Sequence, residues 1–139
     1  AGSFDVFEHI KNDQKAADEA YRVLKNNGIL IFSVPAFQLL FSSHDKALCH
    51  QRRYSKENIK NLLSQFSDLK IFFCNSLLFV PISVVRLLKR KSKSEIDQIN
   101  LPSWMNKLFY KLLLVDNFLI KKGASMIVGL SIVGFCQKK

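Results

Sequence analysis

No apolar run in this chain reaches the roughly 18 uninterrupted residues that a membrane-spanning helix needs. The two most apolar stretches are residues 77–88 and 108–120, and Arg86 interrupts the first while Lys111 interrupts the second. The chain also lacks a positively charged start followed by an apolar core. We therefore expect neither a membrane span nor a signal peptide.

Cysteine is scarce, with only Cys49, Cys74 and Cys136. Their number is odd, they lie far apart, and no C-x-x-C pair occurs, which argues against a disulfide framework and a cysteine metal site. We expect reduced thiols in a cytoplasmic protein, one that could also lie peripheral to a membrane.

Acidic residues are also few, with 11 against 21 Lys and Arg and a net charge of +10. Part of the excess is local, because five basic residues fall between Arg86 and Lys93. Such a cluster can be a solvated connector, or it can attract an anionic lipid surface or nucleic acid. We interpret it first as a connector and second as a membrane-surface contact through Arg86–Lys93. We expect no nucleic-acid partner, because aromatic side chains do not interleave with these charges.

The chain has enough hydrophobic residues to form a core: its 139 residues are 48% hydrophobic and include twelve Phe. This length and composition predict a single folded domain over residues 1–139. Glycine is present at five scattered positions and forms no glycine-rich loop. We find no internal repeat.

The residue pattern predicts strands alternating with helices. A strand tail at 4–7 precedes a helix that Asn12 or Asp13 caps and Gly28 ends. The continuous apolar run at 29–34 is typical of a parallel strand buried on both faces. Ser55 is expected to cap the next helix. Four further elements and a linker follow in order: a strand at 69–75, a helix at 76–91, a linker at 91–100, a helix at 103–122 and a strand at 130–135. We expect an α/β fold with an open, largely parallel sheet.

Three stretches, DVFEHI, AYRVLKNNGILIFSVP and HDKALCHQRRYS, together resemble the C-terminal half of the class I S-adenosylmethionine-dependent methyltransferases. More narrowly, they are similar to the type 11/type 12 methyltransferase group. The resemblance covers residues 4–66 well and the closing strand loosely. It implies a partial Rossmann-like sheet with flanking helices and S-adenosylmethionine as the cofactor of the full-length protein. Residues 77–122 have no counterpart in the general family and are interpreted as a helical insertion.

The family's G-x-G-x-G loop and the acidic residue that ends its second strand have no match in this sequence. Close approach of the backbone to the cofactor needs such glycines. We therefore expect the chain to be a fragment that is inactive alone. A partial sheet would expose residues 29–34 or their flank, so we also expect self-association or domain swapping.

By the resemblance, Phe4 and Asp5 fall where the family's fourth strand ends and would bind the cofactor. Some relatives hold a divalent metal with an E-x-x-E-H pattern, to which Asp5, Glu8 and His9 correspond here. Two carboxylates and an imidazole suit such an ion, and a metal could acidify a hydroxyl acceptor. The alternative is that Glu8 and His9 only cap and orient the following helix.

The loop at 36–53 carries the second candidate site. In the resembling subgroup it covers the active site, where His44 or His50 could be a general base and Arg53 could bind an acidic group of the acceptor. Tyr54 completes this set of catalytic candidates. The alternative is a loop pinned by local hydrogen bonds and an ion pair between Asp45 and an arginine.

Together these features predict an S-adenosylmethionine-dependent methyltransferase fragment that acts on a hydroxyl of a small molecule, one that could be lipid- or glycan-linked. The alternative function is a non-catalytic module that meets a membrane or a partner protein through its basic helical segment. Liposome sedimentation separates the two.

Overall fold

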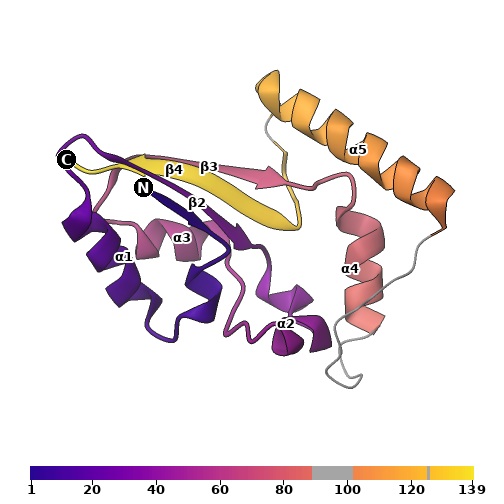
Figure 1. Ribbon diagram of the computed structural model, residues 1–139, viewed down its shortest axis with the longest axis horizontal. Coiled ribbons are helices and arrows are strands. Elements are labelled where there is room, and N and C mark those ends of the chain that lie inside the picture. Colours follow the sequence, from indigo (N-terminus) through magenta and orange to yellow (C-terminus); the bar gives the residue numbers. More distant parts are fainter. Residues whose placement is uncertain (89–101, 125) are drawn as a thin grey trace.

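The computed structural model describes residues 1–88, 102–124 and 126–139. They form one four-stranded sheet with helices around it (Figure 1). The strands are β1 (Gly2–Phe4), β2 (Ile29–Pro35), β3 (Ser67–Cys74) and β4 (Ser131–Gln137), in the spatial order β1-β2-β4-β3. The expected α/β class is confirmed.

The sheet is mixed rather than largely parallel in its pairing. β1 pairs parallel with β2, whereas β4 runs antiparallel to both of its neighbours, β2 and β3. β1, β2 and β3 therefore share one direction and β4 is inserted against them. The cause lies in the chain between β3 and β4, which leaves and re-enters the sheet at the same edge, so that β4 must run back alongside β3.

The helices follow the local capping signals. Short 3₁₀ turns η1 (Phe7–His9) and η2 (Gln38–Leu40) accompany α1 (Asp13–Val23), α2 (Ser43–Ala47), α3 (Lys56–Leu62), α4 (Phe79–Leu88) and α5 (Ser103–Lys121). As expected, the Asn12 side chain accepts a hydrogen bond from Lys15 N at the start of α1, and Ser55 accepts one from Asn58 N at the start of α3. Gly28 does not end α1, which stops at Val23, but lies in the turn before β2.

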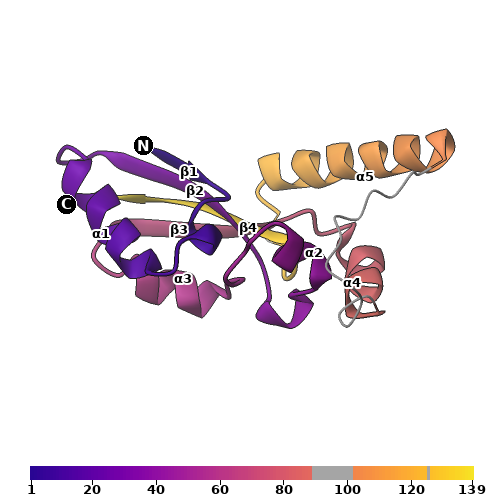
Figure 2. The same cartoon turned by 60° about the horizontal axis from the view of Figure 1, so that its bottom comes forward.

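The core lies between the sheet and the two helices α1 and α3, which cover the same face of it (Figures 1 and 2). Leu30, Phe32 and Val34 of β2 point into this core and are almost fully buried. Gly134 of β4 lies against the Phe32 ring, where a Cβ would clash with that ring and with the Lys70 carbonyl. The packing of the Phe32 ring across β4 thus depends on a glycine at this position.

The opposite face of the sheet stays open to solvent. Ile29 and Ile31 are about half exposed, and Phe135, the partner of Ile31 across the β2–β4 pair, is also exposed. The prediction of a strand buried on both faces is therefore wrong for β2, which alternates between a buried and an exposed side. A continuous apolar run cannot by itself say whether both faces are covered.

α4 and α5 fill the segment expected to be a helical insertion, and α5 lies apart from the sheet (Figures 1 and 2). Pro81 sits at the third position of α4, in the first turn as expected. The side chain of Asp116 in α5 is buried and accepts hydrogen bonds from Asn75 N at 2.8 Å and Ser76 N at 3.2 Å. The expected linker at 91–100 and the basic residues 89–93 lie outside the described residues.

Candidate functional site

The chemistry-bearing residues gather at one edge of the sheet. β1, β2 and β3 end there and β4 begins there, so Asp5, Pro35, Asn75 and Ser131 line a common cavity of about 460 Å³. The edge where parallel strands end is the usual place for a ligand site in open α/β sheets. The position of this cavity, rather than its size, makes it the candidate site.

Loops and helices supply the rest of the lining. The remaining residues are Glu8, His9, His44, Leu48, His50, Arg53, Arg86 and Leu130. The chain has three histidines, and all three line this one cavity. The structure thus brings together Asp5, Glu8, His9, His44, His50 and Arg53, which the sequence had placed in two separate candidate sites.

Backbone contacts dock the second loop onto the first. Gln51 N donates to the Glu8 carbonyl at 2.7 Å, and Arg52 donates to the Lys11 carbonyl at 2.6 Å. Arg52 also forms an ion pair with Asp13 at 2.8 Å. These contacts hold His50, which lies next to Gln51, against η1 and its Glu8 and His9.

Asp45 is the buried centre of the site. Arg53 donates to its Oδ1 from Nη2 at 2.7 Å and from Nε at 2.8 Å, and Arg86 reaches its Oδ2 at 3.1 Å. The backbone of Ser42 donates to the same carboxylate at 2.9 Å as part of a capping box for α2. Burial alone would raise the pKa of Asp45, but Arg53 and the other donors hold that pKa below its usual value. Asp45 is therefore an ionised acceptor throughout the neutral range.

That charge state fixes the orientation of His50. Nδ1 of His50 lies 3.1 Å from Oδ1 of Asp45. An ionised carboxylate can only accept a hydrogen bond, so Nδ1 must carry the proton and Nε2 of the neutral ring keeps its lone pair. The ring also packs edge-on against His9, with 4.7 Å between the centroids. His50 is thus prepared to accept a proton or to bind a cation through Nε2.

Glu8 is fully buried at the floor of the same cavity, and neither carboxylate oxygen has a hydrogen-bond partner among the described residues. Burial raises the pKa of this carboxyl above its usual value. Ligand atoms of Glu8, His9 and His50 all lie within 4.8 Å of one another, a spacing that could hold a metal ion. Such an orphaned carboxylate beside two imidazoles fits a divalent cation.

Asp5 is not part of that three-residue group in the described chain. Its carboxylate accepts a hydrogen bond from Ser33 Oγ at 3.0 Å, and its backbone has a left-handed conformation with φ of 51°. His50, from the second loop, takes the place that the sequence gave to Asp5. Among the described residues the spacing that suits a cation is made by Glu8, His9 and His50, whereas the ligand set of Asp5, Glu8 and His9 stays a prediction.

Phe4 and Asp5 end β1 at the open edge of the sheet. The Phe4 side chain is 63% exposed, and Asp5 lies in the turn that follows. Asp5 lines the cavity at the strand ends, whereas Phe4 is not among the residues that line it. The described residues offer no glycine-rich cradle for a cofactor.

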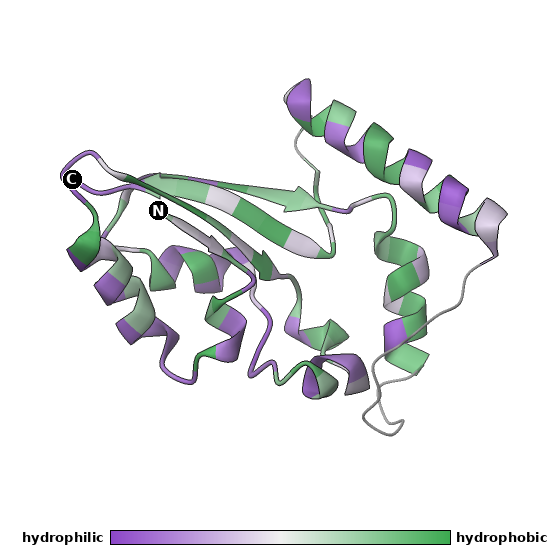
Figure 3. Ribbon diagram, in the orientation of Figure 1, coloured by the Kyte–Doolittle hydropathy of each residue, from purple (hydrophilic) through white to green (hydrophobic). Residues whose placement is uncertain are grey.

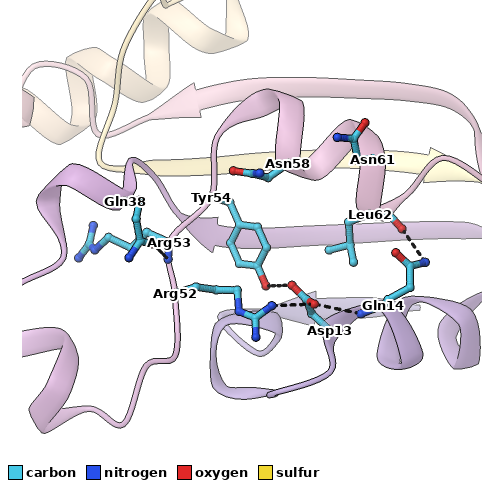
Figure 4. Close-up of a pocket in the computed structure, with 9 residues that line it drawn as sticks. All are labelled: Asp13, Gln14, Gln38, Arg52, Arg53, Tyr54, Asn58, Asn61 and Leu62. Carbon is cyan, nitrogen blue, oxygen red and sulfur yellow. Dashed lines mark hydrogen bonds and ion pairs between the residues drawn. The ribbon is translucent and has the colours of Figure 1, made fainter.

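Tyr54 lies apart from the other catalytic candidates. Its ring is buried in the core, and its hydroxyl donates to Asp13 Oδ2 at 2.8 Å in a second cavity between α1 and α3 (Figure 4). Figure 4 shows Arg52 and Tyr54 converging on Asp13 from two sides. Burial and this hydrogen bond raise the pKa of the Tyr54 hydroxyl. Tyr54 and Arg52 both bind Asp13 here, so these three residues form a structural network.

Sequence reasoning did not assign Arg86 or Asn75 to the site. Arg86 was interpreted as part of a basic surface cluster, yet it points from α4 into the cavity and pairs with Asp45. The only feature of the sequence that distinguished Arg86 from the other basic residues was its position. It is the most N-terminal member of that cluster and lies within an apolar segment. The Asp45–arginine ion pair that was weighed as an alternative is present, and it involves two arginines.

The comparisons with known proteins concern the fold. A family described as "Methyltransferase domain" matches residues 2–32, and none of the curated proteins matches the chain. Three solved structures resemble it over 99% of its length: phosphoethanolamine N-methyltransferase 2 of Haemonchus contortus in complex with S-adenosyl-L-methionine (15% identity, TM-score 0.51), a putative methyltransferase of Bacillus halodurans C-125 (17%, 0.50) and a SAM-dependent methyltransferase of Archaeoglobus fulgidus (15%, 0.52).

The chain spans only part of those proteins: 32% of the Haemonchus contortus chain, 68% of the Bacillus halodurans chain and 57% of the Archaeoglobus fulgidus chain. At these identities the likeness is one of fold. The resemblance to the class I methyltransferases is confirmed at that level.

Proposed function

We propose that this chain, which has the fold of the class I S-adenosylmethionine-dependent methyltransferases, forms the acceptor side of such an enzyme. The observation that carries the proposal is the cavity at the strand ends, where all three histidines meet Glu8, Asp45 and two arginines. Methyl transfer is an in-line displacement, so it depends mainly on positioning and, for a hydroxyl acceptor, on removal of a proton.

S-adenosylmethionine, when bound, supplies an electrophilic methyl group. In this chain Phe4 and Asp5 would contribute one wall of its site. The five glycines of the sequence form no cluster that would let the backbone approach the cofactor closely. We therefore propose that these 139 residues alone do not bind it tightly, and that the activity belongs to a larger assembly of the fold. Isothermal titration with S-adenosylmethionine tests this, and micromolar binding by the chain alone would contradict it.

His50 is the best candidate for the general base. Asp45 fixes its Nδ1–H, which leaves Nε2 as the proton acceptor on a side chain that lines the cavity. A positioned histidine typically contributes 10²–10⁴-fold to a proton-transfer step. His44 lines the same cavity.

A divalent cation held by Glu8, His9 and His50 is the alternative to a His50 general base, because the one lone pair of Nε2 either binds a cation or accepts a proton. The buried, unpartnered carboxylate of Glu8 supports it, because an ionised carboxylate in that position needs a positive partner. Asp45 would accept the hydrogen bond from Nδ1 of His50, as carboxylates outside a metal site commonly do for an imidazole that binds the metal. The ion would supply Lewis acidity toward a hydroxyl of the acceptor.

Arg86 is the best candidate to bind an acidic group on the acceptor, in place of Arg53. The Arg53 side chain is 3% exposed, and its nitrogens are engaged by Asp45 and the Ala36 carbonyl. The Arg86 side chain is 19% exposed, lines the cavity and pairs with Asp45 at 3.1 Å. A phosphate or carboxylate on a small-molecule acceptor, whether lipid- or glycan-linked, suits a guanidinium in this position.

The activity test uses the longest expressed form of the protein. Transfer of a radiolabelled methyl group from S-adenosylmethionine is measured on matched hydroxyl acceptors with and without a phosphate. We expect His50→Gln to lower kcat by about 10²–10⁴-fold and Arg86→Gln to raise KM for the phosphorylated acceptor only. Lys15→Gln, on the exposed surface of α1, is the control. Unchanged kcat in His50→Gln would overturn the assignment.

The cation is tested separately from activity. Zn²⁺ and Mn²⁺ are titrated calorimetrically into the 139-residue chain. We expect binding by the unmodified protein and its loss in Glu8→Gln and His9→Gln, with Asp5→Asn as the matched control that still binds. Equal binding by all four proteins would remove Glu8 and His9 as ligands.

A further inference from the structure

The outer side of α5 carries a stripe of exposed apolar side chains. Trp104, Leu108, Val115 and Phe118 recur at the spacing of one helical face, and each is between 46% and 65% exposed. Lysines interleave with them: Lys111 lies within the stripe, Lys107 flanks it, and Lys122 closes it. The Nζ atom of Lys122 lies 5.7 Å from the centre of the Phe118 ring. We call these seven residues the outer stripe.

No other part of the described chain (residues 1–88, 102–124 and 126–139) covers this stripe. Asp116, on the other side of α5, is buried and bonded to the loop after β3, so it fixes which side of the helix faces inward. α5 lies apart from the sheet in both ribbon views (Figures 1 and 2), and hydrophobic and hydrophilic residues alternate along its ribbon (Figure 3). Asp116 is also the single acidic residue of α5, which leaves the exposed side with lysines as its only charges.

The mixture of lysines and large apolar groups indicates what covers the stripe. Protein–protein interfaces are depleted in lysine, whereas helices that lie on membranes combine Trp, Phe and Leu with Lys. A lysine can bury its methylene stem beside apolar neighbours while its ammonium group reaches lipid phosphates. α5 has 19 residues, about 28 Å of helix, which can lie along a bilayer surface. No helix among the described residues is long and apolar enough to cross a membrane.

We propose that the outer stripe of α5 binds an anionic lipid surface, with the helix lying in the plane of the interface. This location differs from the one expected from sequence, the basic cluster 86–93. Arg86 faces the cavity and Asp45, so it takes no part, and the other basic residues of the cluster lie outside the described residues. The proposal does not depend on methyl transfer.

The chain contains its own probe, because Trp104 is the only tryptophan and lies within the stripe. The protein is mixed with vesicles of phosphatidylcholine and phosphatidylglycerol at 7:3, and with phosphatidylcholine alone. We expect co-sedimentation and a blue shift of Trp104 fluorescence with the anionic vesicles, both weakened by salt. Absence of binding to the anionic vesicles, or binding that leaves the Trp104 spectrum unchanged, overturns the proposal.

Matched variants distinguish binding through this surface from binding that depends only on the net charge of the protein. The triple variant K107Q/K111Q/K122Q removes three positive charges from the stripe and is expected to weaken partitioning on the order of 100-fold. The control K15Q/K25Q/K60Q removes three exposed charges elsewhere and should bind as the unmodified protein does. Equal losses in both variants would overturn the proposal. A blue shift of Trp104 fluorescence that grows with protein concentration in the absence of vesicles would also overturn the proposal, because it would show that a second copy of the chain covers the stripe.

Discussion

Asp45→Asn is the substitution that most directly tests the construction of the site. The side chain of Asp45 is fully buried and lies between Arg53, Arg86 and His50. The amide of asparagine keeps the shape but removes the charge, and its NH₂ group would face donors rather than acceptors. The Arg53 guanidinium, itself 3% exposed, would then be a buried cation without a counter-ion.

Removing one partner of a buried ion pair typically costs about 3–5 kcal/mol, because the remaining charge is left uncompensated. Domains of this size have free energies of unfolding of about 5–15 kcal/mol, so the loss would be a large share of the total. The hydrogen bond from Arg53 to the Ala36 carbonyl remains in the variant. We therefore expect a loss within that range, toward its lower end.

Urea unfolding followed by circular dichroism measures the loss at pH 7. The pKa of Asp45 is lower in the folded than in the unfolded protein, so its stabilising contribution is present above the unfolded pKa. That contribution is lost as the pH falls through the lower, folded pKa. The difference between the two proteins should therefore shrink at acid pH. A difference below about 1 kcal/mol at pH 7, or one that does not shrink in acid, would refute the reasoning. Glu19→Gln breaks an exposed ion pair with Arg22 and should leave stability unchanged.

Three further predictions concern other parts of the molecule. Glu8→Gln should be more stable than the unmodified protein at pH 7. The pKa of Glu8 is raised in the folded state, so the buried carboxyl destabilises the folded protein once the pH rises through that raised pKa and the group ionises. The gain in stability should vanish below pH 4.5, the ordinary glutamate pKa, where the carboxyl is protonated in both states. Asp116→Ala should cost about 2 kcal/mol and increase amide hydrogen exchange throughout α5, whereas an unaltered exchange pattern would show that its hydrogen bonds do not anchor the helix. The open face around Ile31 and Phe135 should cause self-association, so light scattering across a concentration series should show a rising mass. A constant monomer mass would count against it.

Features set by neighbouring residues were predictable from the sequence. The caps Asn12 and Ser55, the start of α5 at Ser103 and the position of Pro81 all depend on contacts within one or two helical turns. Six candidate residues that follow the expected strands line one cavity, and their roles stay predictions: Asp5, Glu8, His9, His44, His50 and Arg53.

Features set by the path of the whole chain were not predictable. The direction of β4 depends on where the segment with α4 and α5 returns to the sheet, which no local pattern encodes. His50 replaces Asp5 beside Glu8 and His9 because the loop contact from Gln51 to Glu8 joins segments some forty residues apart. Arg86 also enters the site through a contact between distant segments, because α4 brings it to Asp45.

The hydrogen bonds from Asn75 N and Ser76 N to Asp116 join the rim of the cavity to α5 through two successive peptide groups. Asn75 lines the cavity, adopts a left-handed conformation with φ of 59°, and is held in it by a side chain of the helix that we propose to lie on lipid. If occupancy of the cavity shifts this residue, it must also change the affinity of α5 for its surface, and by thermodynamic reciprocity the surface must change the affinity of the cavity by the same factor. Asp116 would then act as a coupling element between two binding events, and the size of its effect could be read from either one.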